Sequence, residues 1–127
     1  MKVKILIVDD DPTSLKAVGT VLESNGFEVK ISPHAEDIEK NVKEFDPSLI
    51  VMDLLMPNVD GTQAVKRLQT YPALSKIPVI FLTAVKMRDD DRNLELEVNV
   101  DGRNYRTLTK PLDAKVLLAE IRTLTSV

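Results

Sequence analysis

The sequence contains no cysteine, which excludes disulfide bonds, catalysis by a thiol and zinc sites that use cysteine ligands. No apolar run approaches the roughly 18 residues that span a bilayer, and no signal-peptide segment follows Met1. The net charge of −3 leaves no broad basic surface for nucleic acid. We therefore expect a cytoplasmic chain with no membrane segment and no direct nucleic-acid binding by this domain.

The apolar content is sufficient for one folded domain. The 127 residues are 43% hydrophobic and 29% charged, a balance that supports a single buried core and is not that of a disordered chain. We therefore expect one domain over residues 1–127.

Short apolar runs of strand length alternate with segments of helical periodicity. The runs are nearly continuous, which indicates strands that are buried on both faces of a parallel sheet, with helices covering each face. Asp11 and Pro12 are suited to the N-cap and the first turn of the first helix. The expected strands are Val3–Val8, Phe27–Ile31, Leu49–Met52, Val79–Leu82 and Arg106–Thr109. The expected helical segments are Leu15–Leu22, ended by Asn25-Gly26; Ala35–Phe45; Ala64–Leu68, ended near Tyr71-Pro72; and Leu112–Leu124.

One segment departs from this pattern. Leu94, Leu96, Val98 and Val100 alternate with polar residues, and Asp101-Gly102 then gives a hairpin-type turn signal. A helix would scatter these four apolar side chains around its circumference. We therefore expect an extended or hairpin-like stretch here, with only residues 86–93 left for a short helix.

Polar residues close several of the expected strands. In a parallel sheet the carboxyl ends of the strands meet at one edge, where ligands bind. Carboxylates at this edge would repel one another unless a cation compensates them, and carboxylate oxygens are ligands of Mg²⁺. An aspartate beside a metal, an ammonium and a hydroxyl is suited to accept a phosphoryl group. The residues in question are Asp9, Asp10, Asp53, Thr83 and Lys110, with the small Ala84 allowing backbone N–H groups to approach.

Four motifs give this set a family resemblance. "ILIVDDDP", "LIVMDLLMPNVDG", "IPVIFLTA" and "LTKPLD" occur in this order, and together the chain resembles a receiver domain of a two-component response regulator. The resemblance implies an α/β, flavodoxin-like, doubly wound five-stranded parallel sheet of order 2-1-3-4-5. The fourth helix region is then expected to be shortened or replaced by extended structure.

The resemblance also implies roles for individual residues. Asp53 would accept a phosphoryl group from a phosphohistidine of a sensor histidine kinase or a phosphotransfer protein, and Thr83 and Lys110 would bind the phosphoryl oxygens. Gly61 would give the turn after Asp53 its flexibility. The Mg²⁺ ligands would be Asp9, Asp10, Asp53 and the backbone carbonyl of Leu55.

Two departures from the family pattern concern the surface that transmits the signal and the lifetime of the phosphorylated state. In the family, a Tyr or Phe swings inward when the switch threonine, here Thr83, shifts toward the phosphoryl group. Thr107 occupies the position of this aromatic residue, while Tyr105 lies two residues earlier on the same strand face. The Thr83–Lys110 interval is also longer than usual, so we expect a remodelled output face. In the family, the residues at the positions of Leu55 and Val85 flank the path of the water that hydrolyses the aspartyl phosphate. Both residues are apolar here. We therefore expect a self-phosphorylating switch, not an enzyme in the usual sense, with slow auto-dephosphorylation.

Two other readings remain open. The chain could be a phosphorylation-independent pseudo-receiver that serves as an interaction module. It also satisfies the D-x-D-x-T pattern of haloacid-dehalogenase-type phosphohydrolases, with Asp9 as nucleophile and Asp11 as acid/base. The identity of the nucleophile separates these readings. The output partner is unknown, and the chain is either a stand-alone receiver or a domain of a longer protein whose output domain is missing here.

Overall fold

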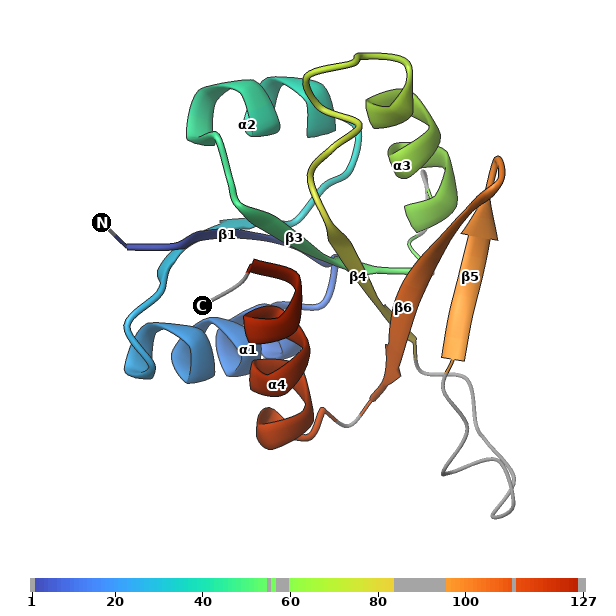
Figure 1. Ribbon diagram of the computed structural model, residues 1–127. Coiled ribbons are helices and arrows are strands. Elements are labelled where there is room, and N and C mark those ends of the chain that lie inside the picture. Colours follow the sequence, from blue (N-terminus) through green and yellow to red (C-terminus); the bar gives the residue numbers. More distant parts are fainter. Residues whose placement is uncertain (1, 55, 57–59, 84–95, 111, 126–127) are drawn as a thin grey trace.

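The computed structural model describes residues 2–54, 56, 60–83, 96–110 and 112–125. In this part of the chain, strands and helices alternate up to β4, after which two consecutive strands precede the last helix (Figure 1). The strands are β1 (Lys4–Val8), β2 (Glu28–Ser32), β3 (Leu49–Asp53), β4 (Val79–Thr83), β5 (Leu96–Val100) and β6 (Arg103–Thr109). The helices are α1 (Pro12–Ser24), α2 (Ile38–Phe45), α3 (Gly61–Gln69) and α4 (Ala114–Thr125).

All the described strands belong to one sheet, of order β2-β1-β3-β4-β6-β5. The parallel strands are β2, β1, β3, β4 and β6. β6 occupies the place expected for the fifth strand, so the predicted order 2-1-3-4-5 is confirmed. β5 adds a sixth, antiparallel strand at the edge beyond β6. The sheet thus has one strand more than the sequence-based description gave it.

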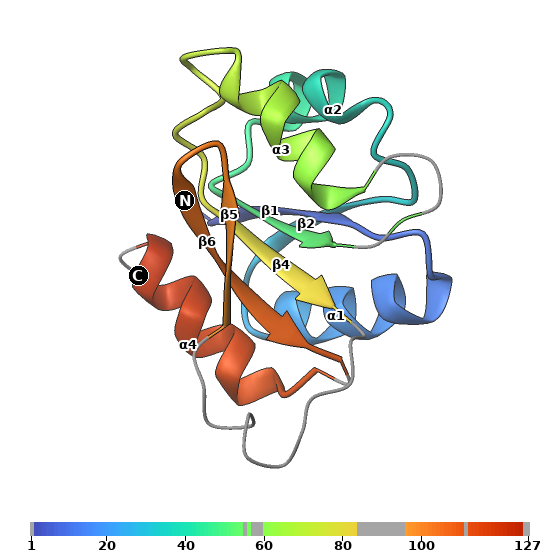
Figure 2. The ribbon, with the colours of Figure 1, turned by 90° about the vertical axis from the view of Figure 1, so that its right-hand side faces the viewer.

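Helices cover both faces of the sheet, as the alternation predicted (Figure 2). Leu6 and Val8 of β1 pack in the core cluster with residues of α2 and α3. Ile5 and Ile7 of the same strand pack in the cluster with residues of α1 and α4. Because successive side chains of a strand point to opposite faces, a continuous apolar run fills both layers of the core.

The alternating segment forms the hairpin that the sequence predicted. β5 and β6 pair antiparallel, with Val100 opposite Arg103 across a two-residue turn. Asp101 and Gly102 both have positive φ, 49° and 90°, which is the backbone of a tight turn between twisted strands. Val98 and Val100 pack on the α3 side of the sheet, so the hairpin extends the core there. Leu94 and the short helix considered for residues 86–93 lie outside the described residues.

Helix ends follow local signals in the sequence. The Asp11 side chain accepts a hydrogen bond from the Thr13 N–H, which confirms the predicted N-cap of α1, and Gly26 at φ 88° follows the end of the helix. α2 begins at Ile38, three residues later than predicted, with Asp37 at its N-cap. None of the described helices has the length and apolar character that a membrane crossing requires.

Gly61 is required for space and not, as expected from the resemblance, for turn flexibility. It is the first residue of α3 and is absent from the positive-φ residues of the described chain. A Cβ at this position would lie 2.7 Å from the Asp53 carbonyl oxygen and 2.9 Å from Cε1 of Phe81. The missing side chain therefore lets the start of α3 pack directly behind Asp53.

Asp60 caps α3 through a reciprocal pair of hydrogen bonds. Its carboxylate accepts from the Gln63 N–H (2.9 Å), and the Gln63 side-chain oxygen accepts from the Asp60 N–H (3.2 Å). The Thr62 hydroxyl donates to the same carboxylate at 2.5 Å. This hydroxyl, followed by the Gln63 N–H, lowers the pKa of Asp60 below its ordinary value because both stabilise the charged form.

The space around Gly61 predicts that Gly61→Ala is destabilising. Overpacking against backbone and a buried ring costs about 1–3 kcal/mol, measured as the free energy of unfolding in urea. Gly19, in the middle of α1, is the matched control, since a Cβ there meets nothing within 4 Å. Gly19→Ala should raise stability by about 0.5–1 kcal/mol. Equal effects of the two substitutions would contradict the packing argument.

The lowered pKa of Asp60 predicts a pH-dependent contribution of the cap. A carboxyl whose pKa is depressed in the folded state contributes stability above its unfolded pKa, near 3.9, and loses it as pH falls through the folded pKa. Asp60→Ala should therefore cost about 1 kcal/mol of unfolding free energy at pH 7, and the cost should shrink below about pH 4. Asp60→Asn, which keeps a cap without a charge, should cost less than Asp60→Ala at pH 7 and should remove the pH dependence of the cap. A cost of Asp60→Ala that is independent of pH would refute this.

Candidate functional site

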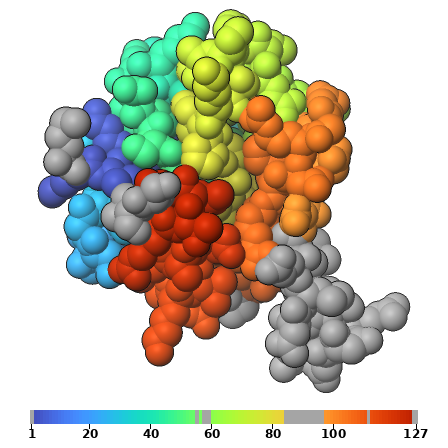
Figure 3. Space-filling model, in the orientation of Figure 1, coloured from blue at the N-terminus to red at the C-terminus, as the bar shows by residue number. Residues whose placement is uncertain are grey.

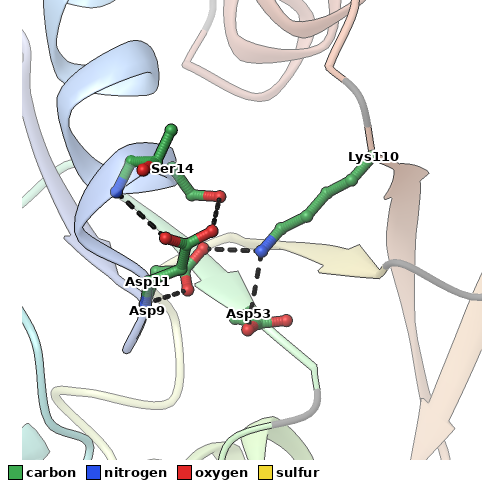
Figure 4. A network of polar contacts seen from close by, with 6 residues as sticks. Asp9, Asp11, Ser14, Asp53 and Lys110 are labelled. Carbon is green, nitrogen blue, oxygen red and sulfur yellow. Dashed lines mark hydrogen bonds and ion pairs between the residues drawn. The ribbon is translucent and has the colours of Figure 1, made fainter.

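Four strand ends place polar residues at one edge of the sheet. Asp9 follows β1, Asp53 ends β3, Thr83 ends β4 and Lys110 follows β6. The strand ends are joined by backbone hydrogen bonds, including that from the Lys110 N–H to the Thr83 carbonyl at 2.8 Å. The pairing of β6 with β4 therefore brings a lysine far along the chain beside the first aspartates (Figure 4).

Asp9, Asp10 and Asp53 form a compact group of carboxylates. One oxygen from each lies within 4.8 Å of the others. Asp9 and Asp53 are buried, with 1% and 6% of their surface exposed, whereas Asp10 is exposed and leaves the group open to solvent. Oxygen donors at this spacing fit a hard divalent cation such as Mg²⁺, which binds through one or two carboxylates and retains several waters.

The Lys110 ammonium lies between the two buried carboxylates. Its Nζ is 2.9 Å from Oδ2 of Asp9 and 3.6 Å from Oδ2 of Asp53. Burial by itself would lower the pKa of Lys110, but the hydrogen bond to Asp9 and the charges of Asp53 and Asp9 outweigh it, so the pKa is raised above its ordinary value. Lys110 is therefore a fixed positive charge at neutral pH, and it compensates part of the repulsion among the aspartates.

Hydrogen bonds at the start of α1 hold the Asp9 carboxylate in place. Oδ1 of Asp9 accepts from the Asp11 N–H at 2.9 Å, while Oδ2 contacts Lys110. The Asp11 carboxylate is turned toward its own helix, where it accepts from the Thr13 N–H (3.0 Å) and the Ser14 hydroxyl (3.2 Å) (Figure 4). Of the three consecutive aspartates, only the first two belong to the carboxylate group.

The three residues considered for a switching role, Thr83, Tyr105 and Thr107, are all buried. Tyr105 is buried, and its ring packs edge-on against Phe81 at 5.7 Å between ring centroids. Thr107 is also buried, and its hydroxyl has no hydrogen-bond partner among the described residues. Thr83, likewise buried, is two residues along β4 from Phe81, which is paired with Thr107. All four side chains thus come from the neighbouring strands β4 and β6.

Gln69 is a residue of this region that the sequence analysis missed. Its side-chain amide donates to the Tyr105 hydroxyl at 2.8 Å and to the Val100 carbonyl at 3.2 Å. It thereby connects the last residue of α3 to both strands of the hairpin. A glutamine near a helix end has no distinguishing sequence signal, since its role depends on which strand folds beside it.

Three of the expected site residues lie outside the described residues. They are Leu55, Ala84 and Val85. The expected roles of the Leu55 carbonyl, of the small Ala84 side chain and of the apolar side chains of Leu55 and Val85 therefore stay predictions.

Comparison with known proteins gives a consistent result. Residues 5–122 match the response regulator receiver domain family. The chain is 33% identical to Protein PilH of Pseudomonas aeruginosa over 118 residues, which cover 93% of each chain. Other curated relatives are longer, and the chain spans only 47% and 54% of the length of two of them.

Solved structures share the fold. The receiver domain of a signal transduction histidine kinase from Syntrophus aciditrophicus superposes with a TM-score of 0.78 at 31% identity, over 97% of this chain and 89% of that one. The receiver domain of the sensor histidine kinase PA1611 from Pseudomonas aeruginosa, with a magnesium ion in its active site cleft, gives a TM-score of 0.82 at 21% identity over the full length of both chains.

The match thus covers most of the chain and includes the strand ends described above. Receiver domains are signalling switches of two-component systems and not enzymes in the usual sense. This chain belongs to the response regulator receiver domain family.

Proposed function

We propose that this protein is a phosphorylation-dependent switch in which Asp53 accepts a phosphoryl group from a phosphohistidine. One observation carries the proposal: the Asp53 carboxylate is buried at the sheet edge, 3.6 Å from the Lys110 ammonium and within a group of three carboxylates. The donor would be a sensor histidine kinase or a phosphotransfer protein. Family membership supports a donor of this kind.

In the proposed transfer, an Asp53 carboxylate oxygen attacks the phosphorus atom of the donor. A P–O bond forms while the P–N bond to the donor imidazole breaks, and the electron pair of the P–N bond returns to the imidazole nitrogen. The negative charge of the transferred group is spread over its three equatorial oxygens, and most of the catalysis consists in stabilising it. Lys110 supplies a positive charge that is already fixed beside Asp53, and the Thr83 hydroxyl at the neighbouring strand end is the second proposed partner.

Asp9, Asp10 and Asp53, together with the Leu55 carbonyl, would hold a Mg²⁺ ion. When bound, the ion supplies positive charge that neutralises the carboxylates and the phosphoryl oxygens. The spacing of the three carboxylates supports this assignment, as does the magnesium in the PA1611 receiver domain. Lys110 contacts Asp9, and the Asp10 carboxylate remains exposed to solvent.

The two other readings are less well supported. A haloacid-dehalogenase-type hydrolase would need Asp11 as a free acid/base, whereas its carboxylate accepts hydrogen bonds from Thr13 and Ser14. A pseudo-receiver would have no use for a half-buried lysine held between two buried carboxylates. The output remains open: the chain matches only about half of its longer relatives, so a further domain or a separate partner would carry the response.

The proposed metal site predicts that Mg²⁺ stabilises the protein. At tenfold excess over the dissociation constant, ligand linkage adds about 1.4 kcal/mol to the unfolding free energy, which raises the thermal midpoint. Asp10→Asn should lose most of this response because it removes the exposed carboxylate of the group. Asp11→Asn is the matched control, since asparagine also caps helices and Asp11 lies outside the group. An equal Mg²⁺ response of both variants would argue against the site.

Phosphorylation itself is tested by intact mass after incubation with acetyl phosphate and Mg²⁺. Wild type should gain one phosphoryl group, whereas Asp53→Asn should gain none because an amide cannot act as the acceptor. Chelating the metal beforehand should prevent the adduct in wild type. Asp9→Asn serves as the control for the hydrolase reading.

An adduct that persists in Asp53→Asn but disappears in Asp9→Asn would mean that Asp9 is the nucleophile. Absence of any adduct, with histidine phosphotransfer proteins also failing as donors, would favour the pseudo-receiver. The decay of the wild-type adduct in the same experiment tests the proposed slow auto-dephosphorylation, which rests on the apolar residues Leu55 and Val85. Substitution of Val85 by Glu should then speed the decay.

A further inference from the structure

β5 is the outer strand of the sheet on the side of the hairpin (Figures 1 and 3). Among the described residues, nothing pairs with its outer edge. Such an edge presents unpaired backbone N–H and C=O groups that can add a further strand. Natural edges are commonly protected by lysine, proline or bulges. β5, with the sequence LEVNV, carries neither lysine nor proline.

The opposite edge of the sheet is protected in this way. β2, with the sequence EVKIS, carries Lys30, a residue type absent from β5, and Lys30 is paired with Glu44 of α2 at 3.9 Å. The two edges therefore differ, and β5 is the one that is suited to accept another strand.

The hairpin geometry fixes which residues of β5 can bond outward. In a two-residue hairpin the residues that flank the turn, here Val100 and Arg103, form a hydrogen-bonded pair, and the pairs then alternate along the strands. Val98 and Val100 therefore direct their backbone groups toward β6. Glu97 and Asn99 direct theirs away from it, and both residues are exposed.

We propose that the β5 strands of two copies of this chain pair antiparallel about a two-fold axis at Val98. The two six-stranded sheets then form one continuous sheet. In this register, Glu97 of each copy faces Asn99 of the other, and the two residues exchange both backbone hydrogen bonds. Four intermolecular backbone hydrogen bonds result, because the contact is symmetric.

Repulsion between like charges disfavours the two neighbouring symmetric registers, whose two-fold axes lie at Glu97 and at Asn99. A two-fold axis at Glu97 would place the two Glu97 side chains directly opposite each other, and an axis at Asn99 would place Glu97 opposite Asp101. Like charges that face each other across strands are destabilising. Within β5, the axis at Val98 places the uncharged Asn99 amide opposite each Glu97 carboxylate.

The side chains of this register are also complementary. The Asn99 amide nitrogen donates one hydrogen bond, to Asn104 at 2.8 Å, so its second hydrogen can be donated to Glu97 of the other copy. On the opposite face, Val98 meets Val98 of the other copy next to the core cluster that includes Val100 and Tyr105. The pairing thus joins apolar residues on one face and hydrogen-bonding residues on the other.

Sedimentation equilibrium of the full chain tests this proposal. Across micromolar to millimolar concentrations, we expect the mass to rise from 14.2 kDa toward twice that value. Asn99→Glu places two carboxylates opposite each other at both symmetric positions and should raise the dissociation constant about tenfold. Asn99→Lys removes the same side-chain hydrogen bonds to Gly102 and Asn104 but restores opposite charges, so it should not weaken the dimer.

A backbone variant tests the edge itself. Glu97→Pro removes an outward N–H and leaves the inward bonds to β6 intact, so it should abolish dimerisation while the circular dichroism spectrum is retained. Glu97→Ala keeps the N–H and should still dimerise. A mass of 14.2 kDa at all concentrations would overturn the proposal, as would equal weakening by Asn99→Glu and Asn99→Lys. Dimers that persist in Glu97→Pro would also overturn it.

Discussion

The ammonium of Lys110 lies between two buried carboxylates, and the geometry of the candidate site depends on that contact. Without a compensating cation, Asp9 and Asp53 would repel each other at the sheet edge where their strands end. Lys110 reaches both because β6 pairs with β4, which brings its backbone N–H to the Thr83 carbonyl. Strand pairing and electrostatics thus support each other, since the sheet positions the charge and the charge stabilises the strand ends.

A second constraint lies behind Asp53, where α3 begins. Gly61 allows this helix to approach the Asp53 backbone, and the Asp60 cap fixes where the helix starts. The proposed acceptor, Asp53, therefore lies between a central strand and a capped helix. Rigid surroundings of this kind keep a nucleophile and its neighbours in a fixed mutual arrangement, which is the main contribution that a protein makes to phosphoryl transfer.

The hairpin of β5 and β6 connects α3 with β4 through side-chain contacts. Tyr105 packs against Phe81, and Gln69 binds both the Tyr105 hydroxyl and the end of β5. α3 is thereby connected to the outer strand of the sheet through the half-buried Gln69 and the buried Tyr105. A response at Thr83 would meet this assembly directly, because Phe81 and Thr83 lie on the same strand. Thr107, which is paired with Phe81 across the strands, and Tyr105, which packs against the Phe81 ring, thus belong to the same assembly.

The sequence by itself determined the elements whose causes are local. Continuous apolar runs specified the parallel strands, Asp11 and Pro12 the start of α1, and the alternation before Asp101-Gly102 the hairpin. Strand order followed from the motifs, and the polar strand ends indicated which residues would meet. The start of α2 was misjudged because Ala35 is apolar and buried but lies before the helix, so its burial comes from packing and not from helical periodicity.

The contacts between distant segments depend on tertiary packing and could not be predicted from sequence patterns. The close approach behind Gly61, the binding of Tyr105 by Gln69 and the distances from Lys110 to the two aspartates all join residues from different elements. The position of β5 at the edge of the sheet likewise depends on tertiary packing, since the alternating pattern predicts a strand but not the strand beside it. The physical reason is that sequence patterns report the burial and backbone preference of each residue, whereas distances between elements are set by how their side chains pack together.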